Sequence, residues 1–169
     1  MRKEYLEAGK IRNVHGLRGE VKAENWLESD GAFAALSSFY LTEDGQRELK
    51  VASRRRQGEL FLLGFEGLSD ADAVRFLKNR TLYARRGDLD PEGKKVFYAE
   101  LSGLPMREAG TGKVYGRIKD VVDRGAGDLY VVELPDGREA YFPAVKEWIR
   151  SADPETGVEV TAPEGIFDL

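Results

Sequence analysis

Three turn signals constrain this chain more than any other feature, because each lies between two strand-like runs. The pairs Asp44-Gly45, Gln57-Gly58 and Asp136-Gly137 are flanked by residues typical of strands. A glycine in such a pair supplies the positive φ that a tight hairpin needs. We therefore predict three antiparallel hairpins in a chain that is built mainly from short strands.

The first half is expected to contain several strands and one distinct helix. Its run from Leu60 to Phe65 is apolar on both faces, which is typical of a buried central strand. Ser69 is expected to cap a helix over residues 70–78, and Asn79 is expected to end it. The other predicted elements are strands over residues 5–14, 19–26, 39–42, 49–52 and 81–84 and a helical turn over residues 32–36.

The second half is again expected to be rich in strands, starting at Val96-Phe97-Tyr98. Pro143 suits the first position of a short helix that continues through Trp148 and Ile149. The other predicted strands cover residues 114–123, 129–134, 138–142 and 158–161.

The stretch from Arg86 to Lys95 is polar and rich in glycine and proline, as linkers often are. We therefore expect one domain over residues 1–86, a linker over 87–95 and a second domain over 96–169. Two strand-rich units with short helices fit closed or nearly closed barrels, so the predicted class is all-β with two domains.

The composition indicates a folded protein without cysteine chemistry and without a membrane-spanning segment. Charged residues make up 33% of the chain and hydrophobic residues 41%, which argues against disorder. The chain has no cysteine, and this excludes disulfides and thiolate metal sites. There is no apolar run long enough to span a membrane, and the start lacks the apolar core of a secretory signal. We expect a cytoplasmic protein that does not bind a membrane.

The net charge of −4 is unevenly distributed along the chain. Residues 1–93 carry 16 Lys and Arg against 16 Asp and Glu, whereas residues 94–169 carry 10 against 14. The second half is therefore acidic and suited to a basic partner, while the neutral first half keeps local basic clusters.

The stretch from His15 to Val21 holds the only histidine, two glycines and two opposite charges. Its residues predict a tight turn that leads into an alternating strand. With other segments, in order and at matching spacing, it resembles the RimM family of bacterial ribosome maturation factors. The segments are Gly9-Lys10-Ile11, His15 to Lys22, Phe65 to Asp70, Phe97 to Leu104, Gly125 to Leu129 and Pro163 to Ile166.

The resemblance implies a six-stranded barrel akin to those of translation factors, joined to a PRC-type barrel. It also implies a non-catalytic factor for maturation of the head of the small (30S) ribosomal subunit and for efficient 16S rRNA processing. Its expected partners are the nineteenth small-subunit ribosomal protein, the precursor subunit and nearby rRNA. We expect a monomer without a cofactor.

Basic residues of the first half are the candidates for RNA contact. Three adjacent arginines on a strand cannot all point inward, and a guanidinium pairs well with phosphate. The alternative is a solvated strand edge whose charges prevent aggregation. The predicted RNA-binding residues are His15, Arg18, Arg54, Arg55 and Arg56.

Two segments of the second half are the candidates for protein contact. An exposed aromatic side chain is a natural interface anchor, although both rings of Phe97-Tyr98 could instead pack in the core. The resembled family usually has two tyrosines here and an aspartate where this chain has Glu100, so one hydroxyl is lost. The small residues after Arg124 either admit a partner or form a tight bend. The predicted residues are Phe97, Tyr98, Gly125, Ala126, Gly127 and Asp128.

Catalysis is not expected. A single imidazole, His15, does not support a histidine-rich metal site or a triad with a second shell. The run from Gly110 to Gly116 misses the spacing of the dinucleotide fingerprint and is better explained as a glycine-rich hairpin. Two other functions stay open: a generic PRC-barrel adaptor unrelated to ribosomes, and a barrel enzyme that uses a flavin or a nucleotide.

Overall fold

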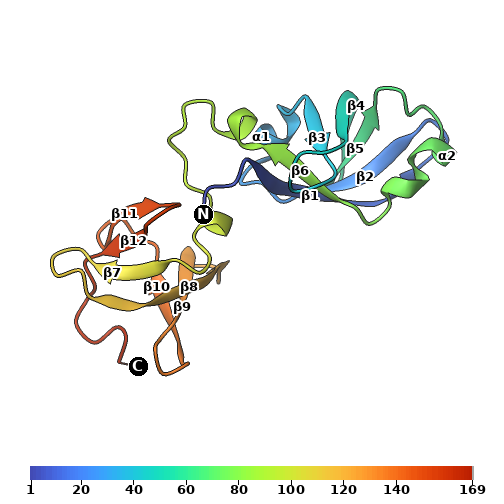
Figure 1. Cartoon of the computed structure of the whole chain (residues 1–169). Helices are drawn as coiled ribbons and strands as arrows, with labels where there is room; N and C mark the ends of the chain where they lie inside the picture. The colour runs from blue at the N-terminus through green and yellow to red at the C-terminus, as the bar shows by residue number, and fades with distance from the viewer. Residues whose placement is uncertain (169) are drawn as a thin grey trace. The chain divides into compact units, whose positions relative to one another are not determined.

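The computed structural model describes residues 1–168, which divide into two compact units. One unit is Lys3–Lys94, and the other contains the rest of the described chain from Lys95 onward together with Met1–Arg2. Each unit has its own sheet and its own hydrophobic core (Figure 1). The predicted all-β class with two domains is confirmed.

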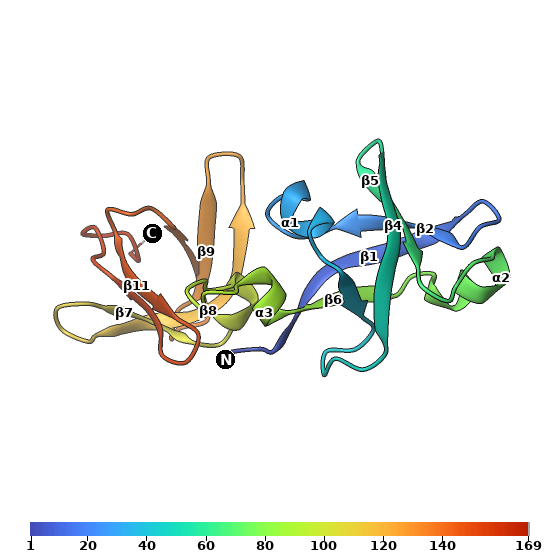
Figure 2. The same ribbon diagram turned by 90° about the horizontal axis from the view of Figure 1, so that it is seen from above.

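The first unit is a closed barrel with the strand order β1-β2-β5-β4-β3-β6. In Figure 2, β4 and β5 run across the direction of β1 and β2, as strands of a small barrel do. In its core the ring of Phe33 packs against those of Phe39 and Phe61, with centroid distances of 5.1 Å and 4.8 Å. The strands are β1 (Tyr5–His15), β2 (Glu20–Asn25), β3 (Ser38–Tyr40), β4 (Glu48–Gln57), β5 (Leu60–Phe65) and β6 (Thr81–Arg85).

Short helices cover parts of this barrel: α1 (Asp30–Ala34), α2 (Ala71–Val74), the 3-10 turn η1 (Arg75–Leu77) and α3 (Arg86–Leu89). The prediction that Ser69 caps the helix is wrong, because the Asp70 carboxylate accepts the amide N–H of Ala73 at 2.8 Å. A carboxylate also interacts favourably with the positive end of a helix. Asn79 ends the turn in the left-handed region, at a φ of 66°.

The second unit is a six-stranded sheet with the order β10-β9-β8-β7-β12-β11. Its pairs are antiparallel except for β12 and β7, which run parallel. The core includes Phe142, Met106 and Val132. The elements are the 3-10 turn η2 (Tyr98–Glu100) and the strands β7 (Pro105–Glu108), β8 (Val114–Asp123), β9 (Asp128–Glu133), β10 (Glu139–Pro143), β11 (Ile149–Asp153) and β12 (Gly157–Val160).

All three predicted hairpins are confirmed, as β3–β4, β4–β5 and β9–β10. The run from Gly110 to Gly116 lies in the β7–β8 hairpin, as expected. Strands β7 and β11 were not predicted.

Two predictions for the second unit are wrong. Pro143 does not begin a helix but ends β10, the outermost strand in the sheet order, where a missing N–H is tolerated. Only one turn follows, in which Ile149 N–H donates to Val145 O, before β11 begins. Tyr98 does not lie in a strand, because Glu100 N–H donates to Phe97 O and Leu101 N–H to Tyr98 O.

Candidate functional site

The turn between β1 and β2 is seated against the loop that precedes α2. Gly16 and Gly19 both take positive φ, at 67° and 83°. Gly19 is buried, and a Cβ at this position would lie 2.3 Å from the carbonyl oxygen of Leu68. The turn therefore approaches that loop as closely as glycine allows, and Leu17 and Arg18 remain exposed beyond it.

Five polar residues from this turn, β2 and β4 line an open hollow of about 460 Å³, which we call the arginine hollow. Its lining residues are Arg18, Glu20, Ser53, Arg54 and Arg55. Within the described chain, Ser53–Gln57 of β4 pair only with β5, and all of them are exposed. This part of β4 thus has a bare edge among the described residues, and three of its residues, Ser53, Arg54 and Arg55, line the hollow.

Glu20 and Arg55 form the central ion pair of the arginine hollow. Arg55 donates from Nε to Glu20 Oε2 at 3.1 Å and from Nη2 to Glu20 Oε1 at 2.9 Å. The hydrogen bond from Arg55 lowers the pKa of Glu20, and the same bond raises the pKa of Arg55. In contrast, the side chains of Arg18 and Arg54 form no ion pair or hydrogen bond with any residue between 1 and 168.

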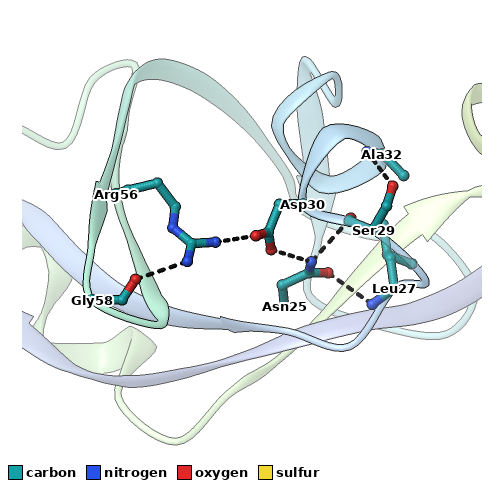
Figure 3. A network of polar contacts seen from close by, with 7 residues as sticks. All are labelled: Asn25, Leu27, Ser29, Asp30, Ala32, Arg56 and Gly58. Atoms are coloured by element: carbon teal, nitrogen blue, oxygen red, sulfur yellow. Dashed lines mark hydrogen bonds and ion pairs between the residues drawn. The ribbon is translucent and has the colours of Figure 1, made fainter.

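Arg56 lies in a different environment from its two neighbours. It is ion-paired with Asp30 and donates from Nη2 to Gly58 O at 2.8 Å (Figure 3). Asn25 Nδ2 also donates to Asp30, at 3.1 Å, so the guanidinium belongs to a network around the start of α1 (Figure 3). It also lies 5.1 Å from the ring centroid of Phe61. The three predicted arginines therefore do not act as one group, since the guanidinium of Arg56 is already engaged by Asp30 and Gly58.

His15 ends β1, where it is half-buried and pairs in register with Glu20. It does not line the arginine hollow, but it is close enough to contribute to the lowered pKa of Glu20. Glu20 and Ser53 were not predicted as site residues. Glu20 stands in the family-like stretch from His15 to Lys22, but only the pairing of β2 and β4 with β5 shows what it contacts.

A second group of residues, which we call the tyrosine cluster, consists of Tyr98, Asp128 and Tyr130. Tyr98 donates its hydroxyl to Asp128 Oδ2 at 2.7 Å, and its ring lies edge-on to that of Tyr130 at 5.9 Å. Burial and then the Asp128 carboxylate raise the pKa of Tyr98. The Tyr98 side chain is nevertheless 44% exposed, so it is fixed in place while still accessible.

Phe97 is half-buried next to Tyr98, and its N–H donates to Glu100 Oε1 at 3.4 Å. Glu100 itself is buried, at 1% exposure. Of the two adjacent aromatic residues, Tyr98 is thus the one with the larger exposed surface. Tyr130 was not predicted, since its place in β9 marks it only as a core residue.

The predicted loop Gly125, Ala126, Gly127 joins β8 to β9, and its three residues are exposed. Gly125 and Gly127 take φ values of 89° and 104°, and Asp123 Oδ1 accepts the N–H of Gly125 at 2.8 Å. Asp123 and Asp128 face each other in register at the end of the two strands. The loop therefore ends in two opposed carboxylates, one of which holds Tyr98.

Other kinds of site were sought across the described part of the chain. No group of three or more His, Asp or Glu side chains in residues 1–168 is placed to hold a metal ion. Among the helices found there, none has the length and apolar character that crossing a membrane requires.

Known protein families match both units. Residues 6–89 match the family model described as the RimM N-terminal domain, and residues 98–166 match the one described as the RimM PRC barrel domain. The protein named ribosome maturation factor RimM from Clostridioides difficile (strain 630) is 28% identical over 166 residues, covering 97% of this chain and 96% of that protein.

A protein of the same name from Limosilactobacillus reuteri (strain DSM 20016) is 30% identical over 167 residues, covering 96% of this chain and 99% of that protein. Among solved structures, the N-terminal domain of RimM from Thermus thermophilus matches with a TM-score of 0.44 and 21% identity. The match covers 53% of this chain and 95% of that one.

Proposed function

The chain belongs to the RimM family, and on that premise we propose that it is a ribosome maturation factor that acts by binding. Its curated relatives are named as maturation factors and not as enzymes. The proposed target is the head of the precursor small subunit in the cytoplasm, where the protein acts as a monomer and promotes 16S rRNA processing indirectly.

One observation carries this proposal: the two units present surfaces of different chemistry. The first unit exposes Arg18 and Arg54, both free of internal ion pairs within residues 1–168, beside a bare strand edge. The second unit exposes the Tyr98 ring next to Asp123 and Asp128. Guanidinium groups suit phosphates, whereas an aromatic anchor flanked by carboxylates suits a basic protein.

A division of labour follows. The arginines of the first unit contact rRNA phosphates, and the tyrosine cluster docks a basic ribosomal protein, for which the nineteenth small-subunit protein is the proposed partner. Such a factor stabilises one conformation of a precursor by differential affinity. It dissociates when the mature subunit no longer offers the same surface.

Cosedimentation of the purified protein with precursor and mature small subunits, at low and moderate salt, tests the proposal. We expect preferential retention on the precursor. Retention on neither particle by a folded protein would contradict it. To test the division of labour, Arg18 and Arg54 are changed to Gln together, and Tyr98 is changed to Ala in a separate protein.

The double arginine variant should lose retention on precursor particles and show a weaker salt dependence, because fewer phosphate contacts release fewer counterions. Its binding to the isolated ribosomal protein should stay close to that of the wild type. Tyr98→Ala should show the opposite pattern. A variant of Lys113 and Lys146 to Gln removes two exposed charges from the second unit and serves as a charge control.

A further inference from the structure

The geometry of Arg55 in the arginine hollow suggests a specific ligand. A guanidinium carries five N–H donors in a planar fork. Glu20 engages one edge of that fork, through Nε and Nη2. Three N–H donors are left over, two on Nη1 and one on Nη2. One of the Nη1 donors and the remaining Nη2 donor point the same way and can make two parallel hydrogen bonds to one anion. The Arg55 side chain is 61% exposed, so this second edge is open to a ligand.

We propose that the arginine hollow binds a phosphodiester group of an RNA backbone, and that Glu20 is a positioning residue that presents the free edge of Arg55 to it. This inference rests on the proposed function. Arg18 and Arg54 supply two further cations around the same space. With three arginines and one carboxylate, the lining keeps an excess of positive charge even though Glu20 is present.

The alternative is that Glu20 merely competes with the ligand for Arg55. The geometry favours positioning, because a long arginine side chain loses much rotamer freedom when it binds a ligand. A side chain that is already held by two hydrogen bonds has lost part of that freedom before the ligand arrives.

The lining also favours a nucleic acid over an acidic protein segment. All five lining residues are polar or charged, and none is an aromatic or aliphatic side chain of the kind that anchors protein interfaces. A phosphate needs only charge and hydrogen-bond donors, and Ser53 adds a hydroxyl to the three guanidinium groups.

The test measures the affinity of the full-length protein for a transcript of the precursor small-subunit rRNA over a range of salt concentrations. Glu20→Ala is compared with Glu24→Ala. Glu24 lies on the same strand and pairs with Arg12, outside the hollow, so both changes remove one carboxylate and one ion pair. If charge alone matters, both variants bind RNA more tightly. If Glu20 positions Arg55, Glu20→Ala weakens binding by about three- to tenfold and Glu24→Ala does not.

Arg55→Lys is a second variant that keeps the charge but lacks the planar fork. It should weaken binding to a similar extent with a nearly unchanged salt slope. Arg54→Gln should weaken binding and lower the slope by about one. All variants are checked for folding by far-UV circular dichroism before binding is measured, because Glu24 also accepts the Nε1–H of Trp26 at 3.1 Å and its removal changes the surroundings of that fluorophore directly.

Tighter or unchanged binding by Glu20→Ala, together with weaker binding by Arg54→Gln, would overturn the positioning role and leave the proposed function intact. RNA binding that none of these changes affects would overturn the hollow as the phosphate site. If the Arg54 and Arg55 variants keep RNA binding but no longer bind an acidic protein that the wild type binds, the hollow belongs to a protein partner, and this result would also overturn the inference. A wild-type protein that binds neither the transcript nor precursor particles would instead contradict the proposed function itself.

Discussion

Replacing either glycine of the β1–β2 turn by alanine separates backbone strain from steric clash. Gly16 and Gly19 both have positive φ, so alanine at either position is strained by roughly 1–2 kcal/mol. The space around them differs. No heavy atom outside the adjoining residues lies within 4 Å of a Cβ at Gly16, whereas one at Gly19 lies 2.3 Å from Leu68 O and 3.1 Å from Asp70 N.

The atoms that oppose a Cβ at Gly19 belong to the backbone, so they cannot move away by a rotamer change. Overpacking of this kind costs about 1–3 kcal/mol. Gly16→Ala should therefore lower the free energy of unfolding by roughly 1–2 kcal/mol. Gly19→Ala should lower it by about 2–5 kcal/mol, the sum of strain and clash.

Urea unfolding measures the difference. The chain has two tryptophans, Trp26 in the first unit and Trp148 in the second. In a Trp148→Phe background, fluorescence therefore reports unfolding of the first unit alone. With a slope of roughly 1–3 kcal/mol per molar urea, the midpoint of the Gly19→Ala variant should lie about 1 M below that of Gly16→Ala. Equal midpoints would refute the close seating of this turn against Leu68.

Two further predictions concern pH and packing. The Tyr115 hydroxyl, 2.6 Å from Glu108, lowers the pKa of this carboxyl below its ordinary 4.5. The ionised Glu108 therefore stabilises the fold above pH 4.5, and this stabilisation is lost as the pH falls through the lower pKa of the folded state. Because Glu108→Gln lacks the ionisable group, its urea midpoint should decrease less between about pH 6 and pH 3.5 than that of the wild type, as followed by Trp148 fluorescence. In the first unit, Phe33→Ala should lower the free energy of unfolding by about 3–5 kcal/mol, because the Phe33 side chain is buried. Asp30→Ala should lower it by about 1 kcal/mol or less, because the Asp30–Arg56 ion pair is exposed. Similar urea midpoints for the two variants would contradict this ranking.

Local chemistry determined much of this protein. The hairpins at Asp44-Gly45, Gln57-Gly58 and Asp136-Gly137 were predictable, because a glycine with positive φ between alternating runs is a property of a few adjacent residues. The apolar run of β5 was likewise predictable as a buried strand. The helix predicted at Pro143 was wrong, because its position at the edge of a sheet outweighs its preference for a helix start.

The contacts of the charged residues were decided only by the tertiary structure. Arg54, Arg55 and Arg56 are equivalent in sequence, yet one lacks an ion pair among the described residues, one is held by Glu20 and one by Asp30. Those partners lie 35 and 26 residues away, and the carboxylate that holds Tyr98 lies 30 residues away. The pairing of β2 and β4 with β5 brings Glu20 to Arg55, whereas Asp30 and Tyr98 lie in the short helical elements α1 and η2. Such contacts depend on the register of the sheet and on how the short helices pack, and not on neighbouring residues in the sequence. The fold therefore decides which charged side chains pair with one another and which stay available to a ligand.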